Sequence, residues 1–171
     1  MNIKKHIPNA ITCGNLLCGC LAVVAIFEGN LFTASYLVGL AAVLDFFDGF
    51  AARMLKVSSS MGKDLDSLAD MVTFGLVPGI LMFKLSGIAI EIFNEQNAHT
   101  IPQWASYLAF SIPIFSAIRL AKFNNDTRQS DSFIGLPTPA NTIFFMTFPL
   151  VLSSEINKTG WAHDLIIQLM K

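Results

Sequence analysis

Four aspartates in one short segment are the residues of this chain best suited to chemistry. Asp45 and Asp48 are three residues apart, and Asp66 and Asp70 are four apart. On helices, each spacing places both side chains on one face. Because the segment between the pairs, about residues 54–63, is short, we expect two antiparallel neighbouring helices whose four carboxylates converge on one cavity.

Converging carboxylates favour a site for divalent cations. Four such groups repel one another, whereas hard cations such as Mg²⁺ and Mn²⁺ prefer oxygen ligands. Two ions about 4 Å apart can hold the phosphates of a substrate and stabilise the attacking and leaving oxygens of an in-line displacement. The pattern therefore predicts phosphoryl chemistry at two Mg²⁺ or Mn²⁺ ions, with these ligands: Asp45, Asp48, Asp66 and Asp70.

The residues between the acids suit a substrate that carries phosphates. Gly49 and Ala52 leave room on the face of the helix that bears Asp48. Gly62 marks either a tight turn or a close approach of the backbone to a phosphate. Arg53, at the end of the same helix as Asp48, meets either a diphosphate or a neighbouring acid.

The elements that carry these residues are predicted to be membrane helices. Hydrophobic residues make up 53% of the 171 residues and charged residues only 13%, which is more apolar than a typical soluble domain. Several uncharged runs approach the ~20 residues that span a bilayer. We predict a single, all-α domain over residues 1–171, a polytopic membrane helix bundle of five to six transmembrane helices. The expected helices cover about 8–28, 31–54, 64–90, 101–121 and 139–154, with an incomplete sixth at 161–171.

Small residues and prolines should shape the packing of these helices. Gly75 and Gly79 are placed to let helices approach closely in lipid. Pro78 and Pro113 interrupt the third and fourth predicted spans, so local kinks are expected where freed carbonyls find other partners.

The basic residues predict the orientation of the bundle. Eight of the eleven lie on one side of the predicted spans: Lys4, Lys5, Arg53, Lys56, Lys63, Arg119, Lys122 and Arg128. Lys and Arg accumulate on the cytoplasmic side, so we expect the acidic site to face the cytoplasm from the inner membrane. A net charge of −1 and the absence of a basic, aromatic-rich run argue against nucleic acid as a partner.

Eight residues together resemble the signature of the CDP-alcohol phosphotransferase family, without a gap: Asp45, Asp48, Gly49, Ala52, Arg53, Gly62, Asp66 and Asp70. The resemblance implies that the first three aspartates bind the metal pair, and that Asp70 lies beside the metals and deprotonates the acceptor alcohol. That oxygen would attack the β-phosphorus of a CDP-linked lipid and release CMP. The resemblance also implies a homodimer.

Further stretches resemble the bacterial and archaeal phosphatidylserine synthase branch of that family. They are PNAITCGNLLCG at 8–19, LDSLADMVTFG at 65–75, RLAKFN at 119–124 and FIGLPTPAN at 133–141. This resemblance implies CDP-diacylglycerol as donor and serine as acceptor.

Two groups of polar residues in these stretches have open roles. Asn9 and Thr12 either line the nucleotide and phosphate site or form hydrogen bonds between helices. A second group could contact the acceptor or a phosphate: Arg119, Lys122 and Asn124. Alternatively, these residues only mark the cytoplasmic end of a helix, where basic residues are common.

Two alternatives remain at this stage. Within the family, the acceptor could be glycerol 3-phosphate or inositol phosphate, which would need a second phosphate pocket. From another class, a divalent-cation transporter would also place acids in membrane helices, and it would show ion flux without CMP formation.

Overall fold

The computed structural model describes residues 6–57, 59–97, 100–125 and 137–154, and all the regular structure in these residues is helical. The elements are α1 (His6–Phe27), α2 (Leu31–Met54), α3 (Ser60–Asp70), the π-helical turn η2 (Met71–Leu76), α4 (Val77–Gln96), the 3₁₀ segment η3 (Gln103–Phe110), α5 (Ser111–Asn125) and α6 (Thr138–Ser154). The predicted all-α class is confirmed.

Four helical segments are long and apolar enough to cross a membrane: His6–Phe27, Leu31–Met54, Ser60–Gln96 and Gln103–Asn125. The third begins earlier and ends later than predicted, because the Ser59 side chain caps its start by accepting from the Gly62 N–H. The next break comes only at Asn97, whose backbone is extended. The predicted fifth helix corresponds to α6, whereas the predicted incomplete helix at 161–171 lies outside the described residues.

The first two helices form an antiparallel hairpin that provides much of the core. Gly29 adopts a φ of 79° in the turn, and the Asn30 side chain accepts from the Thr33 N–H at the start of α2. Small side chains that are almost fully buried let α1 and α2 pack closely: Ala22, Ala25, Ala34 and Ala41.

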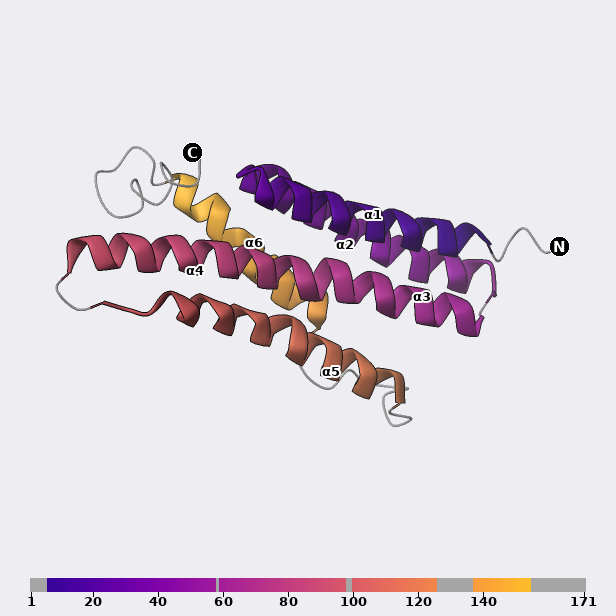
Figure 1. Ribbon diagram of the computed structural model, residues 1–171. Helices are drawn as coiled ribbons and strands as arrows, with labels where there is room; N and C mark the ends of the chain where they lie inside the picture. Colours follow the sequence, from indigo (N-terminus) through magenta and orange to yellow (C-terminus); the bar gives the residue numbers. More distant parts are fainter. Residues whose placement is uncertain (1–5, 58, 98–99, 126–136, 155–171) are drawn as a thin grey trace.

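The arrangement gathers four helix ends at one end of the bundle (Figure 1). These are the start of α1, the end of α2, the start of α3 and the end of α5. α3, η2 and α4 form one continuous rod, while α6 crosses behind it. The acidic residues of α2 and α3 therefore lie toward the same end of the molecule.

At Pro78, the predicted new partner for a freed carbonyl is confirmed. A proline lacks an N–H, so the carbonyl four residues earlier loses its helical donor. That carbonyl belongs to Phe74, and it accepts a hydrogen bond of 2.7 Å from the hydroxyl of Thr142 on α6. The π-helical turn η2 ends at Leu76, two residues before this proline, and α6 supplies a hydrogen-bond partner for the carbonyl.

The predicted close approach at Gly75 and Gly79 is also confirmed. A Cβ placed on Gly79 would lie 2.7 Å from Cδ of Pro113, and one on Gly75 would lie 3.3 Å from Cβ of Ser116. Neither position has room for a larger residue without movement of α5. These two glycines therefore fix the contact between the long rod and α5.

Candidate active site

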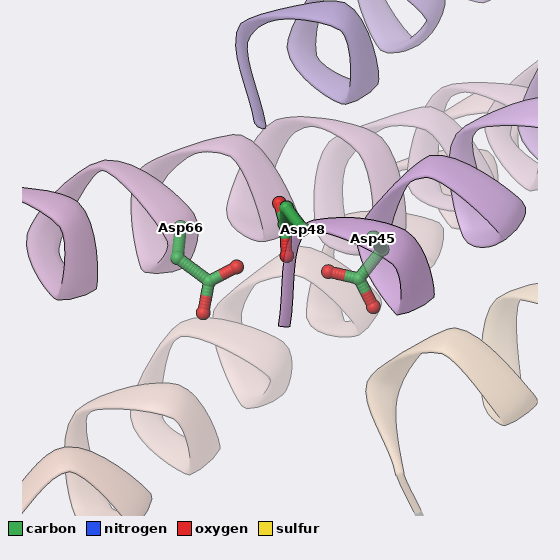
Figure 2. Close-up of side chains that lie close together, drawn as sticks. All are labelled: Asp45, Asp48 and Asp66. Atoms are coloured by element: carbon green, nitrogen blue, oxygen red, sulfur yellow. The ribbon is translucent and has the colours of Figure 1, made fainter. Parts of the chain in front are cut away.

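Three carboxyl groups from two helices meet beside α1. Asp45 and Asp48 lie on α2 and Asp66 lies on α3, and one oxygen from each lies within 4.8 Å of the other two. In the view of Figure 2, Asp48 lies between Asp45 and Asp66. Asp48 is only 6% exposed, while the other two are partly buried. The structure thus brings these three predicted site residues together.

The donor set of this cluster fits a hard divalent cation. Every ligand atom is a carboxylate oxygen, which is the ligand type that Mg²⁺ and Mn²⁺ prefer. Oxygens on opposite sides of Mg²⁺ are about 4 Å apart, since each lies ~2.1 Å from the ion. The separation of at most 4.8 Å is within reach of that value after small side-chain shifts. The cluster could therefore hold a metal ion.

Asp70 lies next to this cluster. Its carboxyl group is close enough to that of Asp45 for a hydrogen bond between them. The Asn15 side chain on α1 donates to Asp70 Oδ1 over 3.4 Å. All four predicted acids thus lie in one neighbourhood.

The polar residues near the start of α1 face the acids. The Thr12 hydroxyl lies 2.7 Å from Asp48 Oδ2, to which it donates, and also 3.0 Å from the Pro8 carbonyl oxygen. Asn9 and Thr12 both line a cavity of about 250 Å³ beside the acids. This location agrees with a role at the nucleotide or phosphates, although Thr12 also makes the inter-helix bond of the alternative reading.

The cavity collects residues from the starts of α1 and α3, the end of α2 and the loop between α2 and α3. Its lining consists of Pro8, Asn9, Thr12, Asp48, Gly49, Ala52, Val57, Ser59, Gly62, Lys63 and Asp66. Seven of these were predicted as site residues from the sequence. The cavity opens beside the three-acid cluster, so a molecule within it would lie next to a bound cation.

Gly62 is tightly packed in the cavity wall. A Cβ at this position would lie 3.0 Å from Ser59 Oγ and 3.1 Å from Asn9 Oδ1. Its N–H donates to Ser59 Oγ, which caps α3. Both readings of this glycine therefore have support: it belongs to a tight helix start, and its backbone lines the cavity.

Lys63 lines the cavity and was not singled out from the sequence as a site residue. It precedes Asp66 by three residues, a spacing that places both on one helix face and could have indicated it. Its Nζ donates to the Asn124 carbonyl oxygen over 3.3 Å. Among the lining residues named above, Lys63 is the one with a positive charge.

The other predicted basic residues do not line this cavity. Arg53 donates from Nε to the Gly49 carbonyl oxygen on its own helix, 3.1 Å away. Arg119 and Lys122 lie on α5. Asn124 donates to Ser67 Oγ over 2.7 Å, so it ties the end of α5 to α3.

Replacing Gly49 with alanine should stabilise the protein and impair substrate binding. A Cβ on Gly49 would meet nothing within 4 Å, because the position faces the cavity. We expect the Gly49→Ala protein to be about 0.5–1 kcal/mol more stable, since glycine in a helix interior is unfavourable. If the cavity holds the substrate, we expect kcat/KM to fall about tenfold, because the new methyl group would take up part of the cavity.

Gly39→Ala is the matched control for this substitution. Gly39 lies on the same helix, and a Cβ there also meets nothing within 4 Å, but it does not line the cavity. It should raise the melting temperature similarly and leave kcat/KM unchanged. Equal kcat/KM values for both variants would show that Gly49 does not face the substrate.

Comparison with known proteins identifies the family. The sequence profile described as CDP-alcohol phosphatidyltransferase matches residues 5–169. The chain belongs to the CDP-alcohol phosphatidyltransferase family. It is accordingly an integral membrane protein, in agreement with its four apolar helical segments. No solved structure matches it.

Curated members of this family give a narrower comparison. The chain is 37% identical over 135 residues to the CDP-diacylglycerol–serine O-phosphatidyltransferase of Bacillus subtilis, covering 79% of this chain and 70% of that protein. It is 35% identical to the Helicobacter pylori protein of the same name, covering 80% and 54%. It is 30% identical to the archaetidylserine synthase of Methanothermobacter thermautotrophicus, covering 88% and 62%. The chain thus spans about half to two thirds of most of these family members.

Proposed function

We propose that this protein transfers a phosphatidyl group from CDP-diacylglycerol to the hydroxyl of L-serine. The serine oxygen forms a bond to the β-phosphorus, the bond from that phosphorus to the CMP oxygen breaks, and the serine proton passes to a base. The products are phosphatidylserine and CMP. The observation that carries this proposal is the three-acid cluster beside a cavity in a member of this family. The names of its relatives support serine as the acceptor.

Each acidic residue has a distinct part in the proposal. Asp45, Asp48 and Asp66 would hold two Mg²⁺ or Mn²⁺ ions, which would neutralise the charge that develops on the phosphate oxygens. Thr12 orients Asp48 by donating to its Oδ2. Asp70 accepts the proton of the serine hydroxyl, because it lies beside the cluster and not within its three-oxygen set.

We further propose that the cavity opens toward the cytoplasm. Among the described residues, Arg53, Lys56, Lys63 and Lys122 lie on the helix ends and the loop at the end of the bundle that holds the cavity. Such an excess of basic residues is typical of the cytoplasmic side. The homodimer implied by the family resemblance stays a prediction.

The test is CMP release by the purified protein in detergent or proteoliposomes. It receives CDP-diacylglycerol, Mn²⁺ or Mg²⁺, and one of three acceptors: L-serine, glycerol 3-phosphate or inositol phosphate. Of the three acceptors, we expect only L-serine to give CMP release, together with phosphatidylserine. Turnover with glycerol 3-phosphate and none with serine would move the protein to another acceptor class. Mn²⁺ flux into liposomes without CMP formation would favour a transporter.

Lys63 should contribute to binding of the lipid nucleotide. Lys63 is the basic residue among those that line the cavity, where the diphosphate of CDP-diacylglycerol would enter. We expect Lys63→Met to raise KM for CDP-diacylglycerol about tenfold and to change kcat by less than about threefold. Lys56→Met is the control, because Lys56 is an exposed lysine of the turn between α2 and α3 and does not line the cavity. Unchanged KM in the Lys63 variant would exclude this contact.

A further inference from the structure

Two polar residues on one face of α1 form hydrogen bonds with two of the acids. Thr12 and Asn15 are three residues apart and face the same side of the helix. Thr12 donates to Asp48, and Asn15 donates through Nδ2 to Asp70 Oδ1. α1 therefore contacts one acid from each of the two acidic helices.

Asn15 is not explained by packing. Its side chain is 0% exposed, and its Oδ1 has no hydrogen-bond partner among the described residues. A buried acceptor without a partner is destabilising, whereas an apolar side chain of similar shape would avoid this penalty. An amide that is half satisfied in a buried place is typical of a residue retained for function.

The backbone of α1 is held rigidly at this point. The Thr73 hydroxyl of η2 donates to the Asn15 carbonyl oxygen over 3.3 Å. One turn further along α1, a Cβ on Gly19 would lie 3.1 Å from Cα of Thr73, so the two helices are in close contact. Asn15 thus projects from a fixed element toward an acid that lies three residues before Thr73.

We infer that Asn15 is a positioning residue for Asp70. Its N–H restricts rotation of the Asp70 carboxyl group and holds it beside Asp45, so that the group meets the acceptor hydroxyl in one orientation. This inference rests on the proposed function, in which Asp70 takes the acceptor proton. Asn15 itself is neither a member of the three-acid cluster nor one of the residues that line the cavity.

Asn15→Leu tests the inference, because leucine keeps the size of the side chain and removes its donor. We expect kcat for CMP release to fall about 10- to 100-fold, the effect of losing a hydrogen bond to a charged group, with KM for CDP-diacylglycerol within about threefold. The melting temperature should change little, because removal of the unsatisfied Oδ1 offsets the loss of the hydrogen bond to Asp70. The rise in melting temperature caused by Mn²⁺ should be unchanged, because the three-acid cluster is intact.

Two further variants keep the test decisive. Asn15→Asp is nearly isosteric and faces Asp70 with a like charge, so its kcat should fall at least as far, and it decides the matter if the leucine variant does not fold. Thr73→Val removes the bond to the Asn15 backbone and serves as the structural control. We expect it to lower the melting temperature and to keep kcat within about threefold.

Three results have different meanings. A kcat within about twofold of the unmodified protein in the folded Asn15 variants would overturn the inference. An equal loss of kcat in Thr73→Val and Asn15→Leu would also overturn it, because the effect would then come from helix packing. Absence of CMP release by the unmodified protein would instead contradict the proposed function.

Discussion

Asp70→Asn protein is expected to release CMP with a kcat about 10²- to 10⁴-fold lower than the unmodified protein, the usual contribution of a general base. Asparagine has nearly the same shape as aspartate, and it can still accept from Asn15, so the fold should be preserved. It cannot take the proton of the serine hydroxyl. The measurement is steady-state CMP release at saturating CDP-diacylglycerol, serine and Mn²⁺.

Metal binding distinguishes the base from the ligands. Asp70 is outside the set of three oxygens that lie within 4.8 Å of one another. Stabilisation by Mn²⁺ should therefore persist in Asp70→Asn, with affinity reduced by less than about tenfold. Full turnover by this variant would contradict the assignment of Asp70 as the base.

Asp66→Asn should make the protein more stable than the unmodified protein without metal, and less stable than it with Mn²⁺. Without metal, the variant should be more stable by about 1 kcal/mol, because one of three crowded, partly buried negative charges is removed. With Mn²⁺ at 100 times its dissociation constant, the unmodified protein gains about 2.7 kcal/mol, and the variant should gain much less. We also expect CMP release to fall by about 10³-fold or more. Thermal unfolding in detergent, once with EDTA and once with Mn²⁺, measures the stability difference between the variant and the unmodified protein in each state.

Asp64→Asn is the matched control for Asp66→Asn. Asp64 lies on the same helix two residues earlier, is exposed and does not line the cavity. Its replacement removes the same charge from the same helix, so it controls for net charge and for helix effects. Equal behaviour of the two variants in Mn²⁺ would mean that Asp66 is not a ligand.

Much of the site could be predicted from the sequence because it depends on local spacing. The intervals between Asp45 and Asp48, and between Asp66 and Asp70, place each pair on one helix face regardless of tertiary detail. A short connection then makes the two helices neighbours, which is enough to bring the pairs together. The same reasoning located Gly49 on the open side of α2.

The remaining features depend on how helices cross, and spacing alone does not determine that. The helical repeat predicts that Thr12 and Asn15 share a face, but only the packing of α1 shows that they contact Asp48 and Asp70. Similarly, Asn124 follows a basic helix end in the sequence, yet the end of α5 packs on α3, where Asn124 bonds to Ser67. Long-range packing assigns these partners.

The π-helical turn that follows Asp70 has a consequence for how the length of this protein can vary. Such a turn holds one residue more than the α-helix that would replace it, and each residue of an α-helix adds about 100° of rotation. Loss of one residue between Met71 and Phe74 would therefore restore a regular α-helix with little net rotation, so the acidic segment would still face α2 while Gly75 and Gly79 stayed against α5. Descendants of this sequence should therefore tolerate a single deletion within this turn more readily than one between Asp66 and Asp70, where it would rotate the two acids relative to each other by about 100°.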